Sequence, residues 1–165
     1  MTDLPFIGVV GLGTMGLGIA QVYAQAGFTV LATDADVRAC ETAGDRMASA
    51  LQSRVAAGKL NQADCDAALS RFAVVGQLAD LAPAGLVIEA IVERLQAKRD
   101  LFAALEQVVA PDCILATNTS SLPIHAVALG LLHPERVLAL HFFNPPAAMR
   151  LVELAPHETT DPEAV

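Results

Sequence analysis

The sequence predicts an α/β fold: a doubly wound, mostly parallel sheet with helices on both faces and antiparallel strands near the C-terminus. Three observations support this prediction. Short apolar runs of strand length alternate with segments of helix length along most of the chain. The first apolar run ends in a cluster of glycines that opens a helix. The last two runs, "LALHFF" and "RLVEL", are joined by a short proline-containing turn.

The composition is typical of one compact domain. The chain has 165 residues, of which 54% are hydrophobic and 17% are charged, so it can bury a sizeable core and is not a disordered segment. No apolar run reaches the length of a membrane span. The N-terminus "MTDLPFIGVV" enters its first strand too early for a signal or transit peptide. We therefore expect a cytoplasmic protein formed by one domain over residues 1–165.

The charge balance limits the partners. A formal net charge of -8 argues against nucleic acid and against an anionic membrane surface. An anionic substrate would need a local basic patch, because the overall field repels it. The cysteines Cys40, Cys65 and Cys113 are odd in number and lack the spacing of metal ligands. We expect reduced thiols and no metal site.

Residues 5–34 carry the clearest motif: a strand, a glycine turn, a helix, a second strand and an acidic residue. In G-x-G-x-x-G, the first glycine permits a tight turn, the second lets a pyrophosphate approach the backbone, and the third allows close helix–strand packing. The start of the helix supplies free N–H donors for phosphates. This context predicts a Rossmann-like dinucleotide module. We assign the whole loop to the cofactor: Gly11, Leu12, Gly13, Thr14, Met15 and Gly16.

Asp34 indicates which dinucleotide binds. It ends the second apolar run and lies 18 residues beyond Gly16. Its carboxylate can accept hydrogen bonds from both hydroxyls of an adenine ribose, and its charge would repel a 2′-phosphate. NAD is therefore the expected cofactor, although the nearby Arg38 leaves NADP open.

The middle of the chain continues the alternation of helices and strands. We expect a long helix over residues 36–57 with Asp36 as its N-cap, and a short helix capped by Asn61. Further elements are expected as strands near 72–75, 86–90 and 113–117 and as a helix near 93–109. Ligands of such sheets bind beyond the carboxyl ends of the strands.

The predicted helix near 93–109 carries a lysine where an apolar residue is expected. Its apolar stripe includes Leu95 and Phe102, and Lys98 lies on the same stripe between them. Lys98 either points into the ligand crevice or snorkels to solvent. Glu93 falls in the first turn of this predicted helix, where the helix dipole alone explains an acidic residue.

A polar cluster follows the strand near 113–117. Ser121 and Pro123 are typical of the start of a helix. Asn118, Thr119 and Ser120 remain, at a position where either a substrate or a turn accounts for them.

His141 lies in an otherwise apolar predicted strand, where its imidazole needs a hydrogen-bonding partner. If the two last strands form an antiparallel pair centred on Ala147, His141 directly faces Glu153. A buried glutamate that accepts a ring N–H would fix the tautomer and leave the other nitrogen to take a proton. Next to a hydride-accepting cofactor, this pair fits the oxidation of an alcohol.

The sequence resembles the N-terminal NAD-binding domain of the 3-hydroxyacyl-CoA dehydrogenases over essentially its whole length. The resemblance rests on "GVVGLGTMGLGIA", "VIEAIVERLQAKRDLF", "ATNTSSLPI" and "LHFFNPPAAMRLVE". It implies that His141 is the catalytic base, Glu153 its paired acid and Ser120 the serine that bonds the substrate oxygen. It further implies contacts to the ribose and nicotinamide side of NAD, from Glu93, Lys98, Ser120 and Asn144.

The resemblance also implies a reaction, the reversible NAD-linked oxidation of a (3S)-hydroxyacyl-CoA to the 3-ketoacyl-CoA. Arg54 and Lys59, around "AAGKL", are candidates for the basic patch that contacts CoA. Members of the family continue into a helical C-terminal domain that completes the acyl pocket and forms a homodimer. We expect this domain to be absent here, and the chain to bind NAD with slow turnover or none.

Two other interpretations stay open. A β-hydroxyacid dehydrogenase of the 6-phosphogluconate or hydroxyisobutyrate type shares a G-L-G-x-M-G loop but relies on a helical lysine for proton transfer, and "HFFNP" speaks against it. A non-enzymatic relative, similar to the lambda-crystallins, would keep the fold without the activity.

Overall fold

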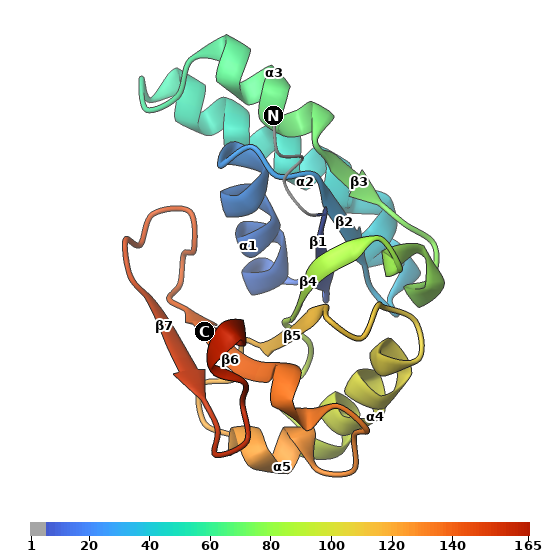
Figure 1. Ribbon diagram of the computed structural model, residues 1–165. Coiled ribbons are helices and arrows are strands. Elements are labelled where there is room, and N and C mark those ends of the chain that lie inside the picture. The colour runs from blue at the N-terminus through green and yellow to red at the C-terminus, as the bar shows by residue number, and fades with distance from the viewer. Residues whose placement is uncertain (1–5) are drawn as a thin grey trace.

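The computed structural model describes residues 6–165, which form one sheet covered by helices on both faces (Figure 1). Its seven strands lie in the order β3-β2-β1-β4-β5-β6-β7. All pairs are parallel except β6–β7, which is antiparallel. The predicted fold class is confirmed. The strands are β1 Phe6–Val10, β2 Val30–Thr33, β3 Phe72–Val74, β4 Ala84–Glu89, β5 Ile114–Thr117, β6 Val137–Phe142 and β7 Val152–Pro156.

Helices connect the parallel strands. Short 3-10 turns, η1 to η3, lie before β4, before β6 and at the C-terminus. The helices and turns are α1 Thr14–Gln25, α2 Val37–Ala56, α3 Gln62–Ser70, η1 Leu78–Leu81, α4 Leu95–Glu106, α5 Ile124–Ala128, η2 Pro134–Arg136 and η3 Pro162–Ala164.

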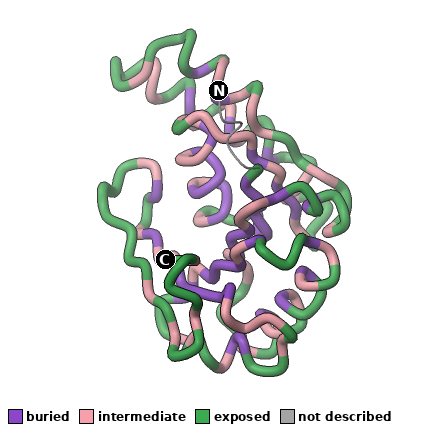
Figure 2. The backbone as a smooth tube through the Cα atoms, viewed as in Figure 1, coloured by how far each residue is buried: buried purple, intermediate pink, exposed green. Residues whose placement is uncertain are grey.

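The central strands are apolar on both sides because both faces of the sheet are covered. On one face, Val9 of β1 belongs to a cluster with Ile19 of α1 and Met47 of α2. On the other face, Val10 of β1 belongs to a second cluster with Phe102 of α4. The buried stretches in Figure 2 accordingly run through the strands and the inner sides of the helices.

The strand order reverses at β1, and this reversal positions the site. β1 pairs with β2 on one side and with β4 on the other. The connections that leave β1 and β4 therefore diverge, and a crevice opens beyond the carboxyl ends of these two strands. Residues 11–13 lead from β1 into α1 at this crevice.

The predicted helix caps are confirmed. The Asp36 side chain accepts a hydrogen bond from Arg38 N at 2.9 Å, and the Asn61 side chain accepts one from Asp64 N at 2.7 Å. Strand boundaries agree with the expected ranges to within two residues. The first strand was expected from residue 5, which lies outside the described residues.

One predicted boundary is wrong and matters for the site. The helix expected near 93–109 is α4, Leu95–Glu106, with Arg94 as its N-cap. Glu93 therefore precedes the helix and is not a first-turn residue whose role the helix dipole explains. It is free to make the contacts described below.

Two further findings concern the described part of the chain. None of its helices has the length and apolar character needed to cross a membrane. Cys40, Cys65 and Cys113 are free thiols. Cys113 lies almost fully buried, and burial raises the pKa of its thiol to about 11.

Candidate active site

The glycine loop has the geometry that a dinucleotide requires. Gly11 has a φ of 101°, and a Cβ there would lie 2.6 Å from the carbonyl oxygen of Ala90. A Cβ on Gly16 would lie 1.7 Å from the carbonyl oxygen of Gly11, so helix and loop can pack this closely only around glycine. A Cβ on Gly13 would meet nothing within 4 Å. Gly13 faces open space at the N-terminus of α1, where a pyrophosphate can approach the backbone.

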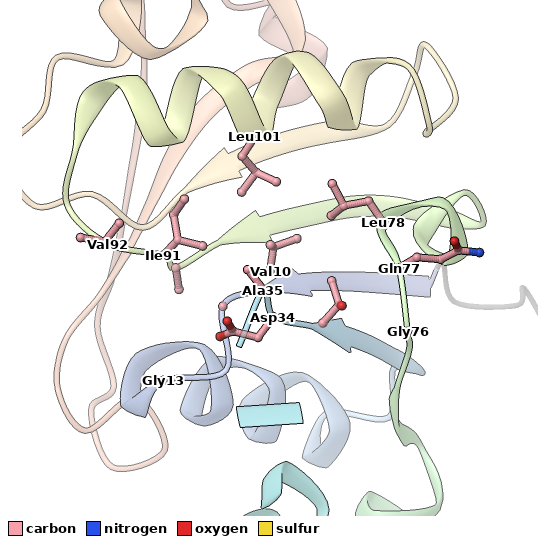
Figure 3. Close-up of a pocket in the computed structure, with 13 residues that line it drawn as sticks. Val10, Gly13, Asp34, Ala35, Gly76, Gln77, Leu78, Ile91, Val92 and Leu101 are labelled. Atoms are coloured by element: carbon pink, nitrogen blue, oxygen red, sulfur yellow. The ribbon is translucent and has the colours of Figure 1, made fainter. Parts of the chain in front are cut away.

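Asp34 shapes the same loop from the end of β2. One carboxylate oxygen accepts a hydrogen bond from Leu12 N at 2.6 Å, and the other accepts one from Asp36 N at 2.8 Å. The side chain is thereby held in one place at the edge of a cavity of about 570 Å³. In Figure 3 the labelled Asp34 lies beside Gly13, with Leu78, Ile91 and other apolar side chains across the cavity. Such a cavity suits an adenosine, with Asp34 at the ribose.

A second cavity of about 340 Å³ lies beyond the ends of β4, β5 and β6. It gathers residues that the sequence analysis drew from four separate segments of the chain. Of the predicted residues it is lined by Met15, Glu93, Lys98, Ser120, His141 and Asn144. The prediction that these residues share one site is thus consistent with their positions.

Lys98 is held by two carboxylates. Its Nζ lies 2.6 Å from Oε1 of Glu89 and 3.1 Å from Oε2 of Glu93. The lysine side chain is only 1% exposed and that of Glu89 is fully buried. Of the two alternatives for Lys98, snorkelling to solvent is therefore wrong, because its ammonium group ends in a buried ion pair at the wall of this cavity.

Glu93 bridges this ion pair to the turn after β5. Its Oε1 accepts hydrogen bonds from the Thr119 hydroxyl and from Ser120 N, the latter at 3.3 Å. Burial acts to raise the pKa of Glu93, but the hydrogen bonds from Thr119 and Lys98, the lysine charge and the Ser120 N–H outweigh it and lower the pKa below its usual range. Glu93 thus remains ionised and fixes the turn that carries Ser120.

His141 and Glu153 form the predicted pair. They are directly opposed in the β6–β7 ladder, and His141 Nδ1 lies 2.8 Å from a carboxylate oxygen of Glu153. This contact leaves Nε2 of His141 for a substrate. Both residues, with Ser120, line a third cavity of about 250 Å³. One part of the expectation is wrong: the Glu153 side chain is 58% exposed, not buried, because β7 is an edge strand.

Asn118 and Asn144 have different surroundings. The Asn118 side chain accepts a hydrogen bond from Phe142 N at 2.8 Å, which ties the end of β5 to the end of β6. Asn144 lies in the connection between β6 and β7, and both asparagines line the second cavity. Asn118 therefore has a structural contact in addition to its place in the cavity wall, and Asn144 stays a candidate cofactor contact.

The two candidates for CoA binding lie outside the three cavities. Arg54 Nη1 donates a hydrogen bond to the carbonyl oxygen of Ala147 at 3.1 Å, so α2 is tied to the β6–β7 connection. Lys59 follows α2 and is exposed. Their role in CoA binding stays a prediction, and for Arg54 this structural contact stands beside it.

Sequence reasoning missed Glu89 and Thr117. Glu89 ends β4, is fully buried, and accepts hydrogen bonds from Ile91 N at 2.7 Å and from the Thr117 hydroxyl at 2.8 Å, in addition to Lys98. The signal was present in "VIEA", where an acidic residue closes an apolar run at the edge where ligands bind.

Within residues 6–165, no group of three or more potential ligand side chains is placed to hold a metal ion.

Comparison with known proteins identifies the family. Residues 6–165 match the family described as "3-hydroxyacyl-CoA dehydrogenase, NAD binding domain". The chain belongs to this family. NAD, the cofactor expected from the glycine loop and Asp34, is the cofactor of this domain family.

Individual relatives agree with this assignment. The NAD-binding domain is 45% identical over its whole length to 3-hydroxyadipyl-CoA dehydrogenase of Escherichia coli (strain K12), of which it covers 35%. It is 46% identical over 160 residues, 96% of the chain, to 3-hydroxybutyryl-CoA dehydrogenase of Mycobacterium tuberculosis (strain CDC 1551 / Oshkosh), of which it covers 56%. The chain thus spans between about one third and just over half the length of these two curated relatives.

Solved structures give the same result. The crystal structure of 3-hydroxybutyryl-CoA dehydrogenase from Escherichia coli K12 superposes with a TM-score of 0.94 at 44% identity, covering 98% of this chain and 34% of that one. The structure of (S)-3-hydroxybutyryl-CoA dehydrogenase from Ralstonia eutropha superposes with a TM-score of 0.93 at 34% identity, covering 98% of this chain and 57% of that one. Membership of the 3-hydroxyacyl-CoA dehydrogenases disfavours the β-hydroxyacid dehydrogenase alternative.

The residues of this 3-hydroxyacyl-CoA dehydrogenase domain fit the cofactor. The open space at Gly13 admits a pyrophosphate to the start of α1. The cavity beside Asp34 suits the adenosine half, and the separate cavity lined by Lys98 and Asn144 leaves room for the other half of a dinucleotide.

Proposed function

We propose that this chain is the cofactor-binding and catalytic domain of an NAD-dependent 3-hydroxyacyl-CoA dehydrogenase. Its reaction is the reversible oxidation of a (3S)-hydroxyacyl-CoA to the 3-ketoacyl-CoA. The observation that carries this proposal is the His141–Glu153 pair, at 2.8 Å, beside the cavity assigned to the nicotinamide half of NAD.

In this proposal His141 moves the proton. Nδ1 of His141 is turned to Glu153, so Nε2 takes the proton of the substrate hydroxyl during oxidation and returns it during reduction. Glu153 holds the ring tautomer and stabilises the imidazolium that forms. Bound NAD supplies the hydride acceptor.

Ser120 positions the reacting oxygen. Ser120 lines both the second and the third cavity, and so lies between the proposed cofactor side and the proposed substrate side. A serine hydroxyl there can donate a hydrogen bond to the substrate oxygen while His141 bonds the same oxygen. Arg54 and Lys59 are the proposed source of positive charge for the CoA phosphates, against the net charge of -8.

Three wider features belong to the same proposal. The complete enzyme includes a helical domain beyond this one and forms a homodimer through it, in keeping with relatives that are about two to three times as long as this chain. Nucleic acid is not a partner, given the acidic balance. The cytoplasm is the proposed compartment, in keeping with three free thiols.

Single-turnover kinetics test the function. The chain, in excess over NADH, is mixed with acetoacetyl-CoA, and the loss of nicotinamide fluorescence is followed over time. We expect slow NADH oxidation that requires the thioester and yields (3S)-hydroxybutyryl-CoA, since the acyl pocket is completed by the further domain. Bound NADH that stays unoxidised with acetoacetyl-CoA, both in this chain and in a chain extended by the further domain, would contradict the proposal and favour a non-enzymatic relative.

A further inference from the structure

Three charged groups, of which Glu89 and Lys98 are buried and Glu93 is half-exposed, form a cluster at the cavity assigned to the nicotinamide, and only Lys98 and Glu93 line it. The Lys98 ammonium is shared between Glu89 and Glu93, at 2.6 and 3.1 Å. Glu93 and Lys98 line the cavity, whereas Glu89 lies behind Lys98 with no exposed surface. Counted with their ordinary charges, two carboxylates and one ammonium leave this cluster with one net negative charge.

The hydrogen bonds of Glu89 show that its charge is fixed in place. Its Oε1 accepts from Lys98 Nζ and from Ile91 N, and its Oε2 accepts from the Thr117 hydroxyl. Three donors on one carboxylate are more than a salt bridge to Lys98 alone requires. They hold an ionised carboxylate at the end of β4, in surroundings from which water is excluded.

The surroundings of the cavity let this charge act over a distance. Apolar side chains, those of Met15, Ile91 and Phe142, form much of its remaining wall. Fixed charges act more strongly beside such a wall than in water. The other ionisable side chain at the cavity, His141, pairs with Glu153, whose side chain is 58% exposed.

We propose that Glu89 is a positioning residue that sets the relative affinity of this domain for oxidised and reduced NAD. This inference rests on the proposed function, because it takes the second cavity as the nicotinamide side. The oxidised nicotinamide ring carries a positive charge and the reduced ring is neutral. A net negative cluster beside the ring therefore stabilises NAD⁺ relative to NADH, and Glu89 supplies the charge that makes the cluster negative.

The Glu89→Gln variant removes the negative charge of this side chain and keeps its shape. Glutamine keeps an oxygen that can accept from Lys98 and Ile91, and its amide can donate to the Thr117 hydroxyl oxygen. The cluster becomes neutral. We expect the ratio of the NAD⁺ dissociation constant to the NADH dissociation constant to rise about three- to tenfold relative to the wild-type chain. NADH affinity is measured by nicotinamide fluorescence, and NAD⁺ affinity by competition against it.

A double variant separates charge from contact. Glu89→Gln combined with Lys98→Met has one net negative charge in the cluster again, now on Glu93, although the Lys98 contact is lost. We expect both affinities to fall while their ratio returns towards the wild-type value. A role of Glu89 that is only structural would instead change both affinities together in the single variant, and the ratio would already be that of the wild type there.

Glu106→Gln is the matched control. Glu106 is also a buried carboxylate, with 5% of its side chain exposed, and it pairs with Arg136 at 3.7 Å and with two backbone N–H groups. It lies at the end of α4, outside the cavities of the site. We expect this variant to lower the unfolding temperature without changing the ratio of the two affinities.

The outcomes separate this inference from the proposed function. A wild-type chain that binds neither form of NAD would contradict the proposed function itself. A wild-type chain that binds both forms, with an unchanged ratio in a folded Glu89→Gln variant, would overturn the role of Glu89 and leave the proposed function standing. If Glu89→Gln does not fold, the double variant carries the test, because an altered ratio there would also overturn it.

Discussion

Nδ1 of His141 lies 2.8 Å from a carboxylate oxygen of Glu153, because the two residues are directly opposed in the antiparallel β6–β7 ladder. Backbone pairing thus sets the geometry of the pair. The imidazole is 24% exposed and the carboxylate 58% exposed, so the base is accessible from the substrate side. The catalytic account depends on this arrangement.

Loss of either member of the pair should slow the reaction. We expect His141→Gln to lower the single-turnover rate of NADH oxidation by about 100-fold or more, and Glu153→Gln by about tenfold or more, because proton transfer loses its base or the group that orients it. NADH affinity should stay the same. The matched control is Glu135→Gln, which breaks a similar pair with His133, 3.0 Å apart and outside the cavities of the site. A rate loss as large in the control would refute the assignment.

Gly13→Ala should weaken cofactor binding without destabilising the fold. The backbone of Gly13 has a φ of -66°, which alanine adopts freely, and the added Cβ meets no protein atom within 4 Å. The methyl group would instead occupy space proposed for the pyrophosphate. We expect an unchanged urea unfolding midpoint and an NADH dissociation constant raised about tenfold or more. Unchanged NADH affinity would place the pyrophosphate elsewhere.

In contrast to Gly13→Ala, the Gly16→Ala substitution should mainly destabilise the fold. Its Cβ would lie 1.7 Å from the carbonyl oxygen of Gly11, so helix α1 and the loop must separate. We expect a loss of about 2 kcal/mol or more in the free energy of unfolding, measured by urea denaturation. Gly44→Ala is the control. Gly44 lies in the exposed middle of α2, where an added Cβ would meet nothing within 4 Å, so this substitution should raise the free energy of unfolding by about 0.5–1 kcal/mol. Equal effects at the two positions would disprove the packing argument.

Asp34→Asn should reduce discrimination between NADH and NADPH. The substitution removes the charge proposed to repel a 2′-phosphate while keeping one oxygen to accept from Leu12 N. We expect the ratio of NADPH to NADH dissociation constants to fall by about tenfold. Asp36→Asn removes the same charge two residues away and keeps a good N-cap. If it lowered the ratio as much, the general field near β2 would be responsible rather than Asp34.

The ionisation of Glu93 should make the free energy of unfolding depend on pH in the acid range. Its pKa is lowered in the folded chain, so its contribution is fully present above the pKa of the unfolded chain, about 4.3, and is lost as the pH falls through the lower folded value. We expect Glu93→Gln to reduce the unfolding free energy at pH 7 by less than about 1 kcal/mol, since solvent screens this half-exposed side chain. The difference from wild type should shrink in urea titrations below about pH 4. A difference from wild type of the same size at pH 7 and below about pH 4 would contradict this role of Glu93.

The features set by local sequence could be predicted. The glycine loop, Asp34 and the caps at Asp36 and Asn61 follow from residues near one another in the chain. The opposition of His141 and Glu153 could also be derived, because a short turn between alternating strands fixes the register. The burial of Glu153 could not, since it depends on β7 being an edge strand.

The cluster around Lys98 shows where sequence reasoning ends. The apolar helix face leaves two alternatives for Lys98, into the crevice or out to solvent, and it does not indicate the partners of the lysine. Glu89 closes a different element, and Glu93 was assigned to the first turn of α4 because the boundary of that helix was placed two residues too early. The distances between β4, α4 and the turn after β5 decide which charges meet, and these distances arise from tertiary packing.

The most direct test of the account is a titration of this chain with NADH and, in parallel, NADPH, followed by nicotinamide fluorescence. The glycine loop, the open space at Gly13 and the carboxylate of Asp34 predict clear saturation with NADH and much weaker binding of NADPH. Binding of neither nucleotide, or equal binding of both by a folded chain, would contradict the assignment of the site.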